Sequence, residues 1–595
     1  MSQYKDPVGS WYRAQVRARK AFNRLPLTEA QKIYILTLLI GALGGLAAVV
    51  FHVLLDFLQN HIIYSIAAAS SWWRIPGVII VPAMGGLITG AGLYFWAPEA
   101  RGSGIPQVKA AFYLDGGRIP FRAFWGKMLF SSLNIGTGAS LGREGPTVQI
   151  CASLASLLGR LFALSRRSLT SLVPVGAATG LAAAFNTPIA AVTFTLEEIL
   201  GDSAARPMGS IVVAAVIAAV VEHSILGEHP LFQVPPYRLN NALELIFYSL
   251  LGVLAGFVAV TFNQSLLRLR KIFLTQRVIP QWATPGAGGL LLGVIGLIAL
   301  LTTGSSSIFG VGYQQLSIVL QSGLPVRVLM ILGAGKLAGT VVSYSSGSSG
   351  GIFGPSLYIG GMLGAIVGLL THSIPGGFAS QPGAFALVGM GAVFAGVVRA
   401  PITSIVMIFE MTGNYSMILP LMIANIISYA VATKLDPNPI YDALLDQDGV
   451  RLPHNELQAL RTVTVGAVMT RNINSLNERI TLKDAFQHIQ ALSRRYHSYP
   501  VLSNEGRLVG LLTFNDFKRA LAVGLEDAPL KEVASKNLVV IIPDSGLDSA
   551  LVQLTKAKVS QLLVVSPNDP GMLMGIVTMH DVARTLNGMT SEPDK

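Results

Sequence analysis

The amino-acid sequence predicts an all-α polytopic membrane protein with an internal inverted repeat, in which broken helices meet at the membrane midplane, followed by a pair of small α/β domains. Three observations support this fold class. Hydrophobic residues make up 51% of the 595 positions and charged residues only 12%, whereas a soluble protein carries about 25% charged residues. Glycine-rich segments recur at fixed spacing within the hydrophobic part. The polar C-terminal part contains a second duplication of its own.

Long apolar runs indicate where helices cross the membrane. Six runs approach or reach the roughly 20 residues that span a bilayer as a helix. These runs are 33–55, 78–96, 171–184, 245–262, 285–303 and 355–371. Other apolar segments are shorter or interrupted by glycine, as expected of broken helices.

Composition divides the chain into consecutive parts with different environments. We expect a polar arm, a hydrophobic block made of two repeats, a polar linker with three prolines, and two soluble domains. The parts are the arm 1–30, the block 31–434 with repeats at about 31–230 and 240–434, the linker 435–461, and the soluble domains 462–523 and 528–590.

The net charge of +12 at pH 7 fits a membrane protein. Cytoplasmic segments next to membrane helices are rich in Lys and Arg, so we expect a cytoplasmic N-terminus, a cytoplasmic C-terminus and a location in the cell membrane. Membrane lipid, and not nucleic acid, is then the partner of these charges. The basic residues of the arm are Lys5, Arg13, Arg17, Arg19, Lys20 and Arg24.

The hydrophobic block is an internal duplication. Lys127 precedes Pro146 by nineteen positions, and Lys336 precedes Pro355 by the same interval. A weaker pair matches 102–104 with 310–312. In transporters with inverted repeats, the substrate site lies near the midplane where broken helices from both halves meet. A further set keeps its intervals in both copies: Gly176, Pro188 and Glu197 recur as Gly389, Pro401 and Glu410.

One ionisable residue lies in a conspicuous place within this frame. Residues 141–146 read Leu-Gly-Arg-Glu-Gly-Pro, and residues 350–355 of the second copy read Gly-Gly-Ile-Phe-Gly-Pro. An ionisable side chain at membrane depth costs roughly 2.5 to 3.5 kcal/mol on insertion scales, so it is a functional candidate by default. Glu144 is therefore a candidate site residue, and Phe353 occupies the matching position of the other copy.

The glycine-rich segments that end in proline are predicted helix starts. Proline is tolerated in the first helical turn, and glycine lets the backbone approach a ligand closely. Helix N-termini carry roughly half a positive charge, so several of them together form an anion site. The alternative is that these segments are kinks that allow close helix packing.

The segments GSGIP (102–106), GREGP (142–146) and GIFGP (351–355) resemble, in the right order, the three signature segments of the CLC chloride channel and transporter family. The similarity continues through AAAFNTPIAAVTFTLEE and covers the hydrophobic block. It implies a homodimer in which each subunit has its own pathway. Chloride and protons would be the transported ions, and no cofactor would be required.

The resemblance also assigns roles to single residues. Ser103 and Tyr441 would donate hydroxyl hydrogen bonds to a central chloride, and the backbone N–H groups of Ile352 and Phe353 would complete its shell. Glu144 would be the external gating glutamate, because a carboxylate can occupy an anion site in place of chloride and leave it when protonated.

Glu198 resembles the internal proton-transfer glutamate of the family. From residue types alone, other roles stay open: Ser103 as a plain N-cap, Tyr441 as an interfacial anchor, and Glu197 with Glu198 as a solvated helix end. Gln107 departs from the family, which often has an acidic residue there, and this changes the local electrostatics.

The family includes both passive channels and chloride/proton exchangers. Exchangers usually keep an ionisable residue at the position of Glu198, because a proton needs a relay to Glu144 and chloride does not. We therefore predict a chloride/proton antiporter. The alternatives are a passive voltage-gated chloride channel and an exchanger for another anion such as nitrate, although Ser103 resembles the chloride-preferring branches.

The soluble part repeats with a period of 65 residues. GLLTFND at 510–516 matches GIVTMHD at 575–581, and each copy is expected to contain a strand, a helix, two β-rich segments and a helix. Each copy resembles a CBS domain. The other residues that recur are Asn472 as Asn537, Leu482 as Leu547 and Ala485 as Ala550.

Pairs of CBS domains often bind adenine nucleotides between the copies, with Asp near the ribose and Thr near phosphate. Thr513, Asp516, Thr578 and Asp581 match those positions, so an adenine nucleotide is a hypothetical regulatory ligand. The alternative is an unliganded dimerisation module, because Thr and Asp also suit N-caps of the following helices.

Other classes of function lack their sequence features. A cation transporter would need carboxylate clusters in the pore, and the apolar block offers few. We find no nucleophile with a paired base, phosphate loop or metal motif, so we predict that the chain is not an enzyme and holds no metal. Cys151 lies in an apolar segment and is interpreted as a packing residue.

The two halves differ at the proposed proton sites. Lys127 pairs with Lys336 and Glu197 pairs with Glu410, so we expect those four residues to be structural. In contrast, Glu144 aligns with Phe353, and Glu198 aligns with Met411. The shared frame would bind the anion, and the differences between the copies would couple it to protons.

Overall fold

The computed structural model describes residues 28–70, 72–162, 164–201, 208–227, 231–239, 241–321, 323–373, 381–452, 460, 463–491 and 498–590. Residues 1–27 of the predicted arm lie outside the described residues, and so do residues 453–459 and 461 of the predicted linker. The chain divides into two compact units, Met1–Val450 and Arg451–Lys595.

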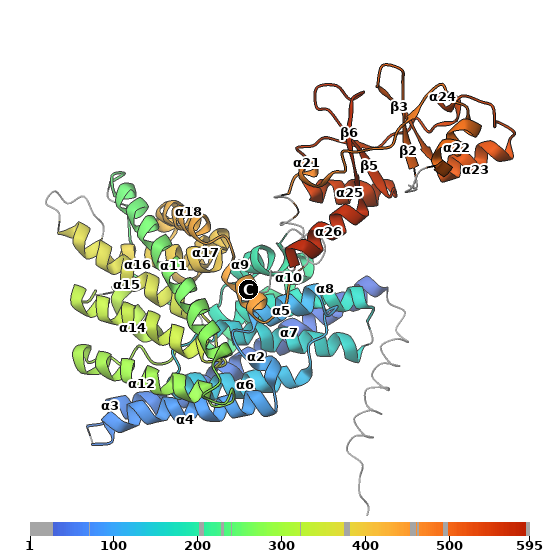
Figure 1. The fold of residues 1–595 in the computed structure, drawn as a ribbon. Helices are drawn as coiled ribbons and strands as arrows, with labels where there is room; N and C mark the ends of the chain where they lie inside the picture. Colours follow the sequence, from blue (N-terminus) through green and yellow to red (C-terminus); the bar gives the residue numbers. More distant parts are fainter. Residues whose placement is uncertain are drawn as a thin grey trace, which may run out of the picture. The chain divides into compact units, whose positions relative to one another are not determined.

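Helices joined by loops form the described part of the first unit (Figure 1). The helices of the first repeat are α2 (Glu29–Gln59), η1 (Asn60–Tyr64), α3 (Ser65–Ala68), α4 (Arg74–Phe95), η2 (Pro98–Ala100), α5 (Ile105–Tyr113), α6 (Phe121–Gly136), α7 (Glu144–Leu161), α8 (Arg166–Phe185), α9 (Pro188–Phe194), η3 (Thr195–Leu200) and α10 (Met208–Leu226). Those of the second repeat are α11 (Glu244–Thr275), α12 (Thr284–Thr303), α13 (Tyr313–Gln321), α14 (Val326–Ser345), α15 (Phe353–His372), α16 (Pro382–Val398), α17 (Pro401–Thr412), η5 (Tyr415–Met417), α18 (Ile418–Leu435) and α19 (Ile440–Gln447).

Nine helical segments among the described residues are long and apolar enough to cross a membrane. The six predicted runs coincide with α2, α4, α8, α11, α12 and α15. The other three segments contain α10, α14 and α18. Polar residues interrupt their apolar runs, for example the buried Lys336 in α14 and the buried Asn425 in α18. The chain is therefore a multi-pass integral membrane protein.

The glycine-rich segments are helix starts, as predicted. Helices α5, α7 and α15 begin at Ile105, Glu144 and Phe353, directly within the three segments. Helices α9 and α17 start in the same way at Pro188 and Pro401, because proline has a helical φ and needs no acceptor in the first turn.

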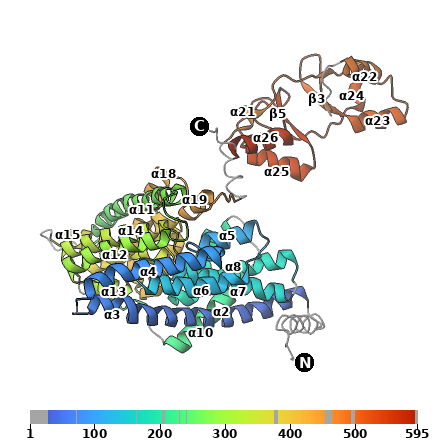
Figure 2. The same cartoon turned by 60° about the horizontal axis from the view of Figure 1, so that its bottom comes forward.

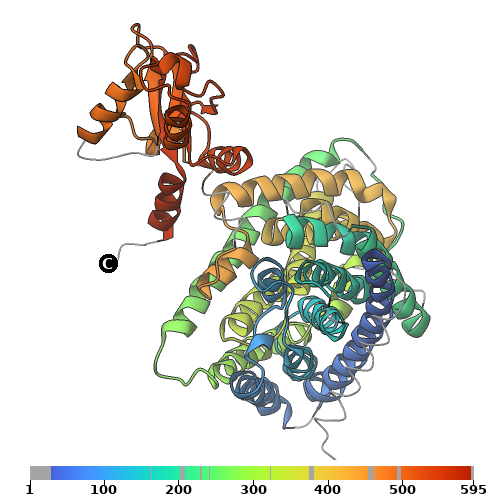
Figure 3. The same cartoon turned by 90° about the vertical axis from the view of Figure 1, so that its right-hand side faces the viewer.

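The two repeats lie side by side within the first unit. In Figure 1, helices α5, α7 and α8 lie on one side and helices α14, α15 and α16 on the other. Helix α4 of the first repeat packs along α12 of the second (Figure 2). Several of these helices are seen end-on in Figure 3. Close packing depends on small residues, since a methyl group on Gly364 would collide with the backbone carbonyl of Phe385.

Two buried lysines hold equivalent loops in the two repeats. Lys127 Nζ donates to Gly102 O at 2.6 Å and to Ala100 O at 2.9 Å. Lys336 Nζ donates to Gly310 O at 2.6 Å and to Ile308 O at 3.2 Å. Gly102 and Gly310, whose correspondence was the weakest in the sequence, thus make equivalent contacts in the two repeats. The prediction that both lysines are structural agrees with this geometry.

Two glutamates cap helices of the opposite repeat. Glu197 accepts from Thr403 N at 2.7 Å and from Ile402 N at 3.2 Å, in the first turn of α17. Glu410 accepts from Ala190 N at 2.7 Å and from Ile189 N at 3.0 Å, in the first turn of α9. Each repeat therefore caps a helix of the other repeat, as expected if an approximate two-fold axis relates the two repeats. It satisfies N–H groups that a helix start leaves without an acceptor.

The second unit contains two similar α/β halves with separate hydrophobic cores. In each half, a short strand pairs in parallel with the middle strand, which pairs antiparallel with the last. This is the predicted order of strand, helix, two strands and helix. Helix α21 packs in the core of the second half and α24 in the core of the first. In chain order the elements are α21 (Val465–Val468), β1 (Leu476–Asn477), α22 (Leu482–Ala491), β2 (Ser498–Leu502), β3 (Leu508–Thr513), α23 (Phe514–Ala522), α24 (Leu530–Val533), β4 (Val540–Ile541), α25 (Leu547–Ala557), β5 (Gln561–Val565), β6 (Leu573–Thr578) and α26 (Met579–Thr590).

Candidate functional site

Backbone bridges bring the three glycine-rich loops together. Gly142 N donates to Gly351 O, and Gly351 N donates to Gly142 O, both at 2.7 Å. Gly102 N donates to Ser348 O at 3.0 Å, and Gly350 N donates to Gly102 O at 3.1 Å. The N-termini of α5, α7 and α15 therefore begin at one place, as the anion-site hypothesis requires.

Glycine is needed where these loops meet. A methyl group on Gly145 would lie 2.6 Å from Ser103 Oγ, and one on Gly351 would lie 3.2 Å from Gly145 N. A Cβ atom at Gly145 would thus occupy the space next to a proposed chloride ligand. The close approach of the backbone explains why glycine is required at these segments.

The Glu144 carboxylate lies at the start of helix α15. The residue is fully buried. Its Oε2 accepts a hydrogen bond from Gly354 N at 3.2 Å, and its Oε1 accepts one from the Tyr313 hydroxyl. Gly354 is the second residue of α15, whose first N–H groups have no acceptor within the helix. A carboxylate here is stabilised by the positive end of the helix dipole, and a chloride ion would be stabilised in the same way.

Tyr313 is itself held from two sides. The Arg143 guanidinium carbon lies 5.6 Å from the centre of the Tyr313 ring. The Phe232 ring meets the tyrosine edge-on, with 5.6 Å between the ring centres. These contacts fix the ring, so its hydroxyl is directed to Glu144 before any ion arrives.

Phe353, the counterpart of Glu144, has an apolar environment. Its ring centre lies 4.3 Å from that of Phe394, 5.2 Å from that of Phe185 and 5.8 Å from that of Phe194. The side chain therefore anchors the start of α15 and leaves only backbone groups for a ligand. The chloride roles of the Ile352 and Phe353 N–H groups stay predictions that fit this arrangement.

Ser103 and Tyr441 lie next to each other although 338 positions separate them in the chain. Both are fully buried. Neither hydroxyl oxygen has a partner at hydrogen-bonding geometry within the described part of the chain. A buried hydroxyl without a partner is costly, by about 1 to 3 kcal/mol, so the pair is suited to donate to a ligand.

The simpler roles of these two residues are wrong. The residue that caps α5 is Gly104, not Ser103, and its N–H donates to Gln107 Oε1 at 3.0 Å. Gln107 Nε2 donates in turn to Arg101 O at 3.0 Å. A carboxylate at position 107 could not make the second bond, so glutamine closes this loop without adding a negative charge. Tyr441 is buried and so cannot be an exposed interfacial anchor.

Glu198 lies in a buried cluster of charged side chains. Its Oε1 is 2.7 Å from Lys109 Nζ, and the same Nζ is 2.6 Å from Asp442 Oδ1. All three side chains are about 5 to 6% exposed. The expectation of a solvated helix end is therefore wrong for Glu198, and Glu197 caps α17 instead.

Sequence reasoning missed Tyr313, Lys109 and Asp442. Lys109 was visible as a lone cation in an apolar helix, and Asp442 directly follows Tyr441. Tyr313 directly follows the glycine-rich segment of the weaker repeat pair. Their contacts join residues far apart in the chain, which spacing alone does not reveal.

The four residues predicted to bind a nucleotide form helix caps in the second unit. Thr513 Oγ1 donates to Asp516 Oδ2 at 2.6 Å and accepts from Asp516 N at 3.2 Å. Thr578 and Asp581 repeat this pattern at 2.7 and 3.2 Å. Thr513 also lines a pocket of about 560 Å³ whose other polar lining residues are Ser498, Asn515, Asn537, Lys558, Ser560 and Gln561.

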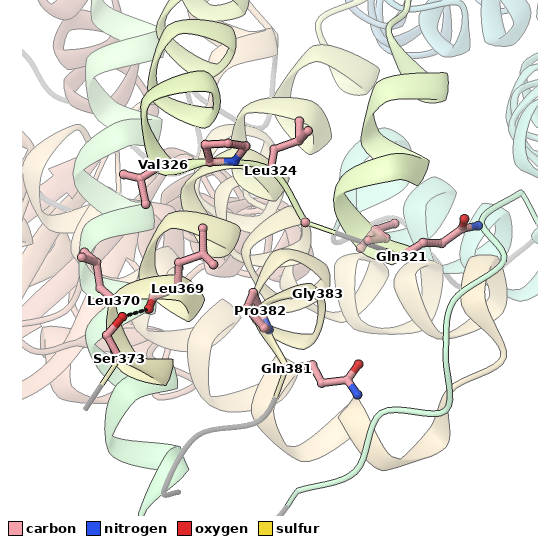
Figure 4. A pocket seen from close by; sticks show the side chains of 12 residues that line it. Gln321, Leu324, Val326, Leu369, Leu370, Ser373, Gln381, Pro382 and Gly383 are labelled. Atoms are coloured by element: carbon pink, nitrogen blue, oxygen red, sulfur yellow. Dashed lines mark hydrogen bonds between the residues drawn. The ribbon is translucent and has the colours of Figure 1, made fainter. Parts of the chain in front are cut away.

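A second pocket, of about 640 Å³, lies at the ends of α13 to α16 (Figure 4). Its wall includes Leu324, Leu369 and Pro382, and its Ser373 hydroxyl donates to Leu369 O at 2.8 Å. None of the predicted site residues lines it, so we assign it no part in transport. Among the described residues, no group of three or more His, Cys, Asp or Glu is arranged to hold a metal ion.

Comparison with known families agrees with this geometry. A family model described as voltage gated chloride channel matches residues 85–433, and a model described as CBS domain matches 465–523 and 530–588. Two H(+)/Cl(-) exchange transporters named ClcA are each 32% identical to this chain. The one from Vibrio campbellii aligns over 68% of this chain and 87% of its own length, and the one from Klebsiella pneumoniae over 73% and 93%. A chloride channel protein ClcB-like from Ralstonia nicotianae is also 32% identical, over 70% of this chain and 97% of its own.

Solved structures are similar as well. A slow cyanobacterial Cl−/H+ antiporter has a TM-score of 0.63 and 26% identity, and the match covers 70% of this chain and 97% of that chain. A eukaryotic CLC transporter has a TM-score of 0.60 at 19% identity, and the match covers 92% of this chain and 97% of that chain. The second likeness supports the fold alone.

Removing the Tyr313 hydroxyl is expected to strengthen chloride binding. A hydrogen bond to a charged group contributes about 1.5 to 3 kcal/mol, and its loss weakens the hold of Glu144 on the anion position. Chloride competes for that position, so we expect it to bind on the order of tenfold more tightly to Tyr313→Phe. Calorimetric titration of chloride into the purified full-length protein in detergent measures the change.

The matched control for this experiment is Tyr358→Phe. It removes a buried hydroxyl that bonds Ser307 at 2.7 Å and has no contact with Glu144. Chloride affinity should equal that of the wild type in this control. Equal affinities of Tyr313→Phe and the wild type would contradict the proposed competition.

Proposed function

Because the chain belongs to the voltage gated chloride channel family, we propose that it is a chloride/proton antiporter, which uses the gradient of one ion to move the other across a membrane. Relatives and a solved structure named as proton/chloride exchangers support exchange over passive conduction. The protein would act by binding and releasing ions, without a cofactor and without enzymatic chemistry.

One observation carries the proposal: a buried ionisable side chain accepts a backbone hydrogen bond at a helix start. The Glu144 carboxylate accepts from Gly354 N at the start of α15. When ionised it competes with chloride for that place, and when protonated it loses its attraction to the helix dipole and can leave. Each cycle of leaving and returning thus exchanges a proton for chloride.

The inner part of the pathway is proposed to use two further groups. Ser103 and Tyr441 would hold chloride through hydroxyls that have no partner among the described residues. Glu198, in its buried cluster with Lys109, would receive the proton on the other side of Glu144. Chloride is the proposed anion because a hydroxyl at Ser103 suits a small spherical ion.

Glu144→Gln is expected to abolish proton coupling while chloride transport continues. Glutamine fills nearly the same space but cannot exchange a proton. Full-length protein in proteoliposomes under a chloride gradient should pump protons when it is wild type. The variant should move chloride with no proton movement above that of empty liposomes.

The matched control is Glu410→Gln. Its carboxylate caps α9 and is not placed on the ion pathway, so the variant should keep the wild-type ratio of protons to chloride. Proton pumping that persists in Glu144→Gln would sink the gating role. Chloride flux without proton movement in the wild type would reject exchange itself.

We propose a homodimer whose contact includes the starts of α9 and α17. Ile189 and Ile402 in these first turns are both 57% exposed, next to carboxylates that cap the two helices. Polar groups that face lipid are costly, and a second copy would cover them. Light scattering in detergent should give the mass of two chains, and the mass of one chain would contradict the proposal.

The proposed location is the cell membrane, with both termini on the cytoplasmic side. The basic residues of the arm support this orientation, since cytoplasmic flanks carry an excess of Lys and Arg. A protease added outside intact cells should leave a C-terminal tag uncut. Cleavage of the tag from outside would reverse the orientation.

We propose that an adenine nucleotide binds in the pocket of the second unit and regulates transport. Thr513 contributes to this pocket, and Gln561 Nε2, in the same pocket, is buried with no partner among the described residues. The caps made by Thr513 and Asp516 also fit an unliganded module, so binding must be measured directly.

Calorimetry of the full-length protein with ATP, ADP and AMP tests this proposal. We expect binding, with ATP weakened on the order of tenfold in Lys558→Asn because a charged partner of phosphate is lost. Asparagine tolerates the left-handed backbone of Lys558, whose φ is 55°. The binding of AMP, which carries less charge than ATP, should be weakened less by this substitution. The absence of heat with every nucleotide would favour a scaffold role.

A further inference from the structure

A buried lysine joins two carboxylates from distant parts of the chain. Lys109 lies on α5, Glu198 on η3 and Asp442 on α19. Lys109 Nζ lies 2.7 Å from Glu198 Oε1 and 2.6 Å from Asp442 Oδ1. Both distances are within hydrogen-bonding range, so one ammonium group binds both acids at once.

This arrangement makes the two carboxylates dependent on each other. A proton taken up by one acid removes its charge and leaves the lysine to interact more strongly with the other. Two ionisable groups that interact in this way titrate as a pair, and the proton belongs to the pair and not to one residue. A site built on Glu198 alone would not need Asp442.

The cluster also lies where the two repeats differ. On the alignment of Gly102 with Gly310, the counterpart of Lys109 is Ser317. On the alignment of Glu197 with Glu410, the counterpart of Glu198 is Met411. The lysines and glutamates with structural roles occur in both repeats, whereas this cluster occurs in one. Burying charged side chains is costly even when they are paired, which favours a use for them beyond holding helices together.

The same two helices carry the hydroxyl pair of the proposed chloride site. Asp442 follows Tyr441 on the first turn of α19, and Ser103 precedes Gly104, the N-cap of the helix α5 that carries Lys109. The contact between Lys109 and Asp442 therefore links α19 to α5 one helical turn from the place where Tyr441 lies beside Ser103. Tyr113, also on α5, ties this helix to η3 by donating to Leu200 O at 2.8 Å.

We propose that Asp442 is a third proton-carrying carboxylate of the transporter, besides Glu144 and Glu198, and that it shares the internal proton with Glu198 across Lys109. This proposal rests on the exchange function proposed above. A hydronium ion gives its proton to one Asp442 oxygen: an O–H bond of the hydronium breaks, a water molecule leaves, and an O–H bond forms on Asp442. That bond then breaks as a new O–H bond forms on Glu198, and the lysine contact shifts from the acid that gains the proton to the acid that loses it. Lys109 acts as a positioning residue. Its contact with Asp442 is loosest while Asp442 holds the proton, and at that stage Tyr441 is freer to admit chloride.

Asp442→Asn tests the proposal in full-length protein in proteoliposomes. Asparagine keeps the shape and an oxygen that can accept from Lys109, but it cannot carry a proton. We expect chloride-driven proton flux to fall about tenfold, with chloride flux within about twofold of the wild type. We also expect the pH profile of proton flux to lose the contribution of one titrating group, because Glu198 would then titrate without Asp442 as its partner.

Two further variants complete the experiment. Asp446→Asn makes the same change at an exposed position of the same helix and should leave the ratio of protons to chloride unchanged. Asp442→Glu keeps a carboxylate and should restore much of the proton flux. A structural role for Asp442 would not produce this rescue together with a changed pH profile.

The outcomes distinguish a failure of the exchange function from a failure of the role of Asp442. Wild-type protein that moves chloride without protons would reject the exchange function itself. Wild-type exchange with unchanged coupling and pH profile in Asp442→Asn would overturn only the role of Asp442. Equal loss of chloride and proton flux in folded Asp442→Asn would also overturn it, because the residue would then be structural.

Discussion

The membrane unit depends on the backbone bridge between Gly142 and Gly351. Two hydrogen bonds of 2.7 Å join the halves of the duplication at this point, so α7 and α15 begin side by side. A bilayer offers no water to satisfy free backbone groups, and irregular backbone at this depth is stable only where it is buried in protein or lines a cavity. The bridge satisfies part of that backbone. At the start of α15, Glu144 accepts from the N–H group of Gly354. The proposed anion site thus depends on how two broken helices are joined.

Around this centre, symmetric contacts hold the frame and asymmetric contacts perform the proposed chemistry. Lys127 and Lys336 bind equivalent loops, and Glu197 and Glu410 cap each other's neighbouring helix starts. These four side chains bind equivalent backbone groups in the two halves, so these contacts do not distinguish one side of the membrane from the other. Glu144 bonded to Tyr313, Phe353 in its ring cluster, and Glu198 with Lys109 have no such counterparts. A directional exchange of two ions requires this kind of difference between the halves.

The sequence predicted the frame well because glycine, proline and buried charge leave local signals. The helix starts at Ile105, Glu144 and Phe353, and the paired roles of the two lysines, follow from spacing and backbone preference. The partners of the functional side chains did not follow, because they come from distant segments: Tyr313 is 169 positions from Glu144, and Asp442 is 333 positions from Lys109. Ser103 and Tyr441 looked like a cap and an anchor, and only the fold shows them buried together. In the second unit, the predicted order of elements is confirmed, while Thr513 and Asp516 bond each other in a way that suits either a cap or a ligand site.

The central claim is that chloride and proton movements are obligatorily linked through residues at which the two repeats differ. The most direct test is the reversal potential of wild-type protein in a planar bilayer, measured at a fixed chloride gradient while the pH gradient is varied. The account predicts that the reversal potential shifts systematically with the pH gradient. A reversal potential that follows the chloride gradient alone, at every pH gradient, would contradict it.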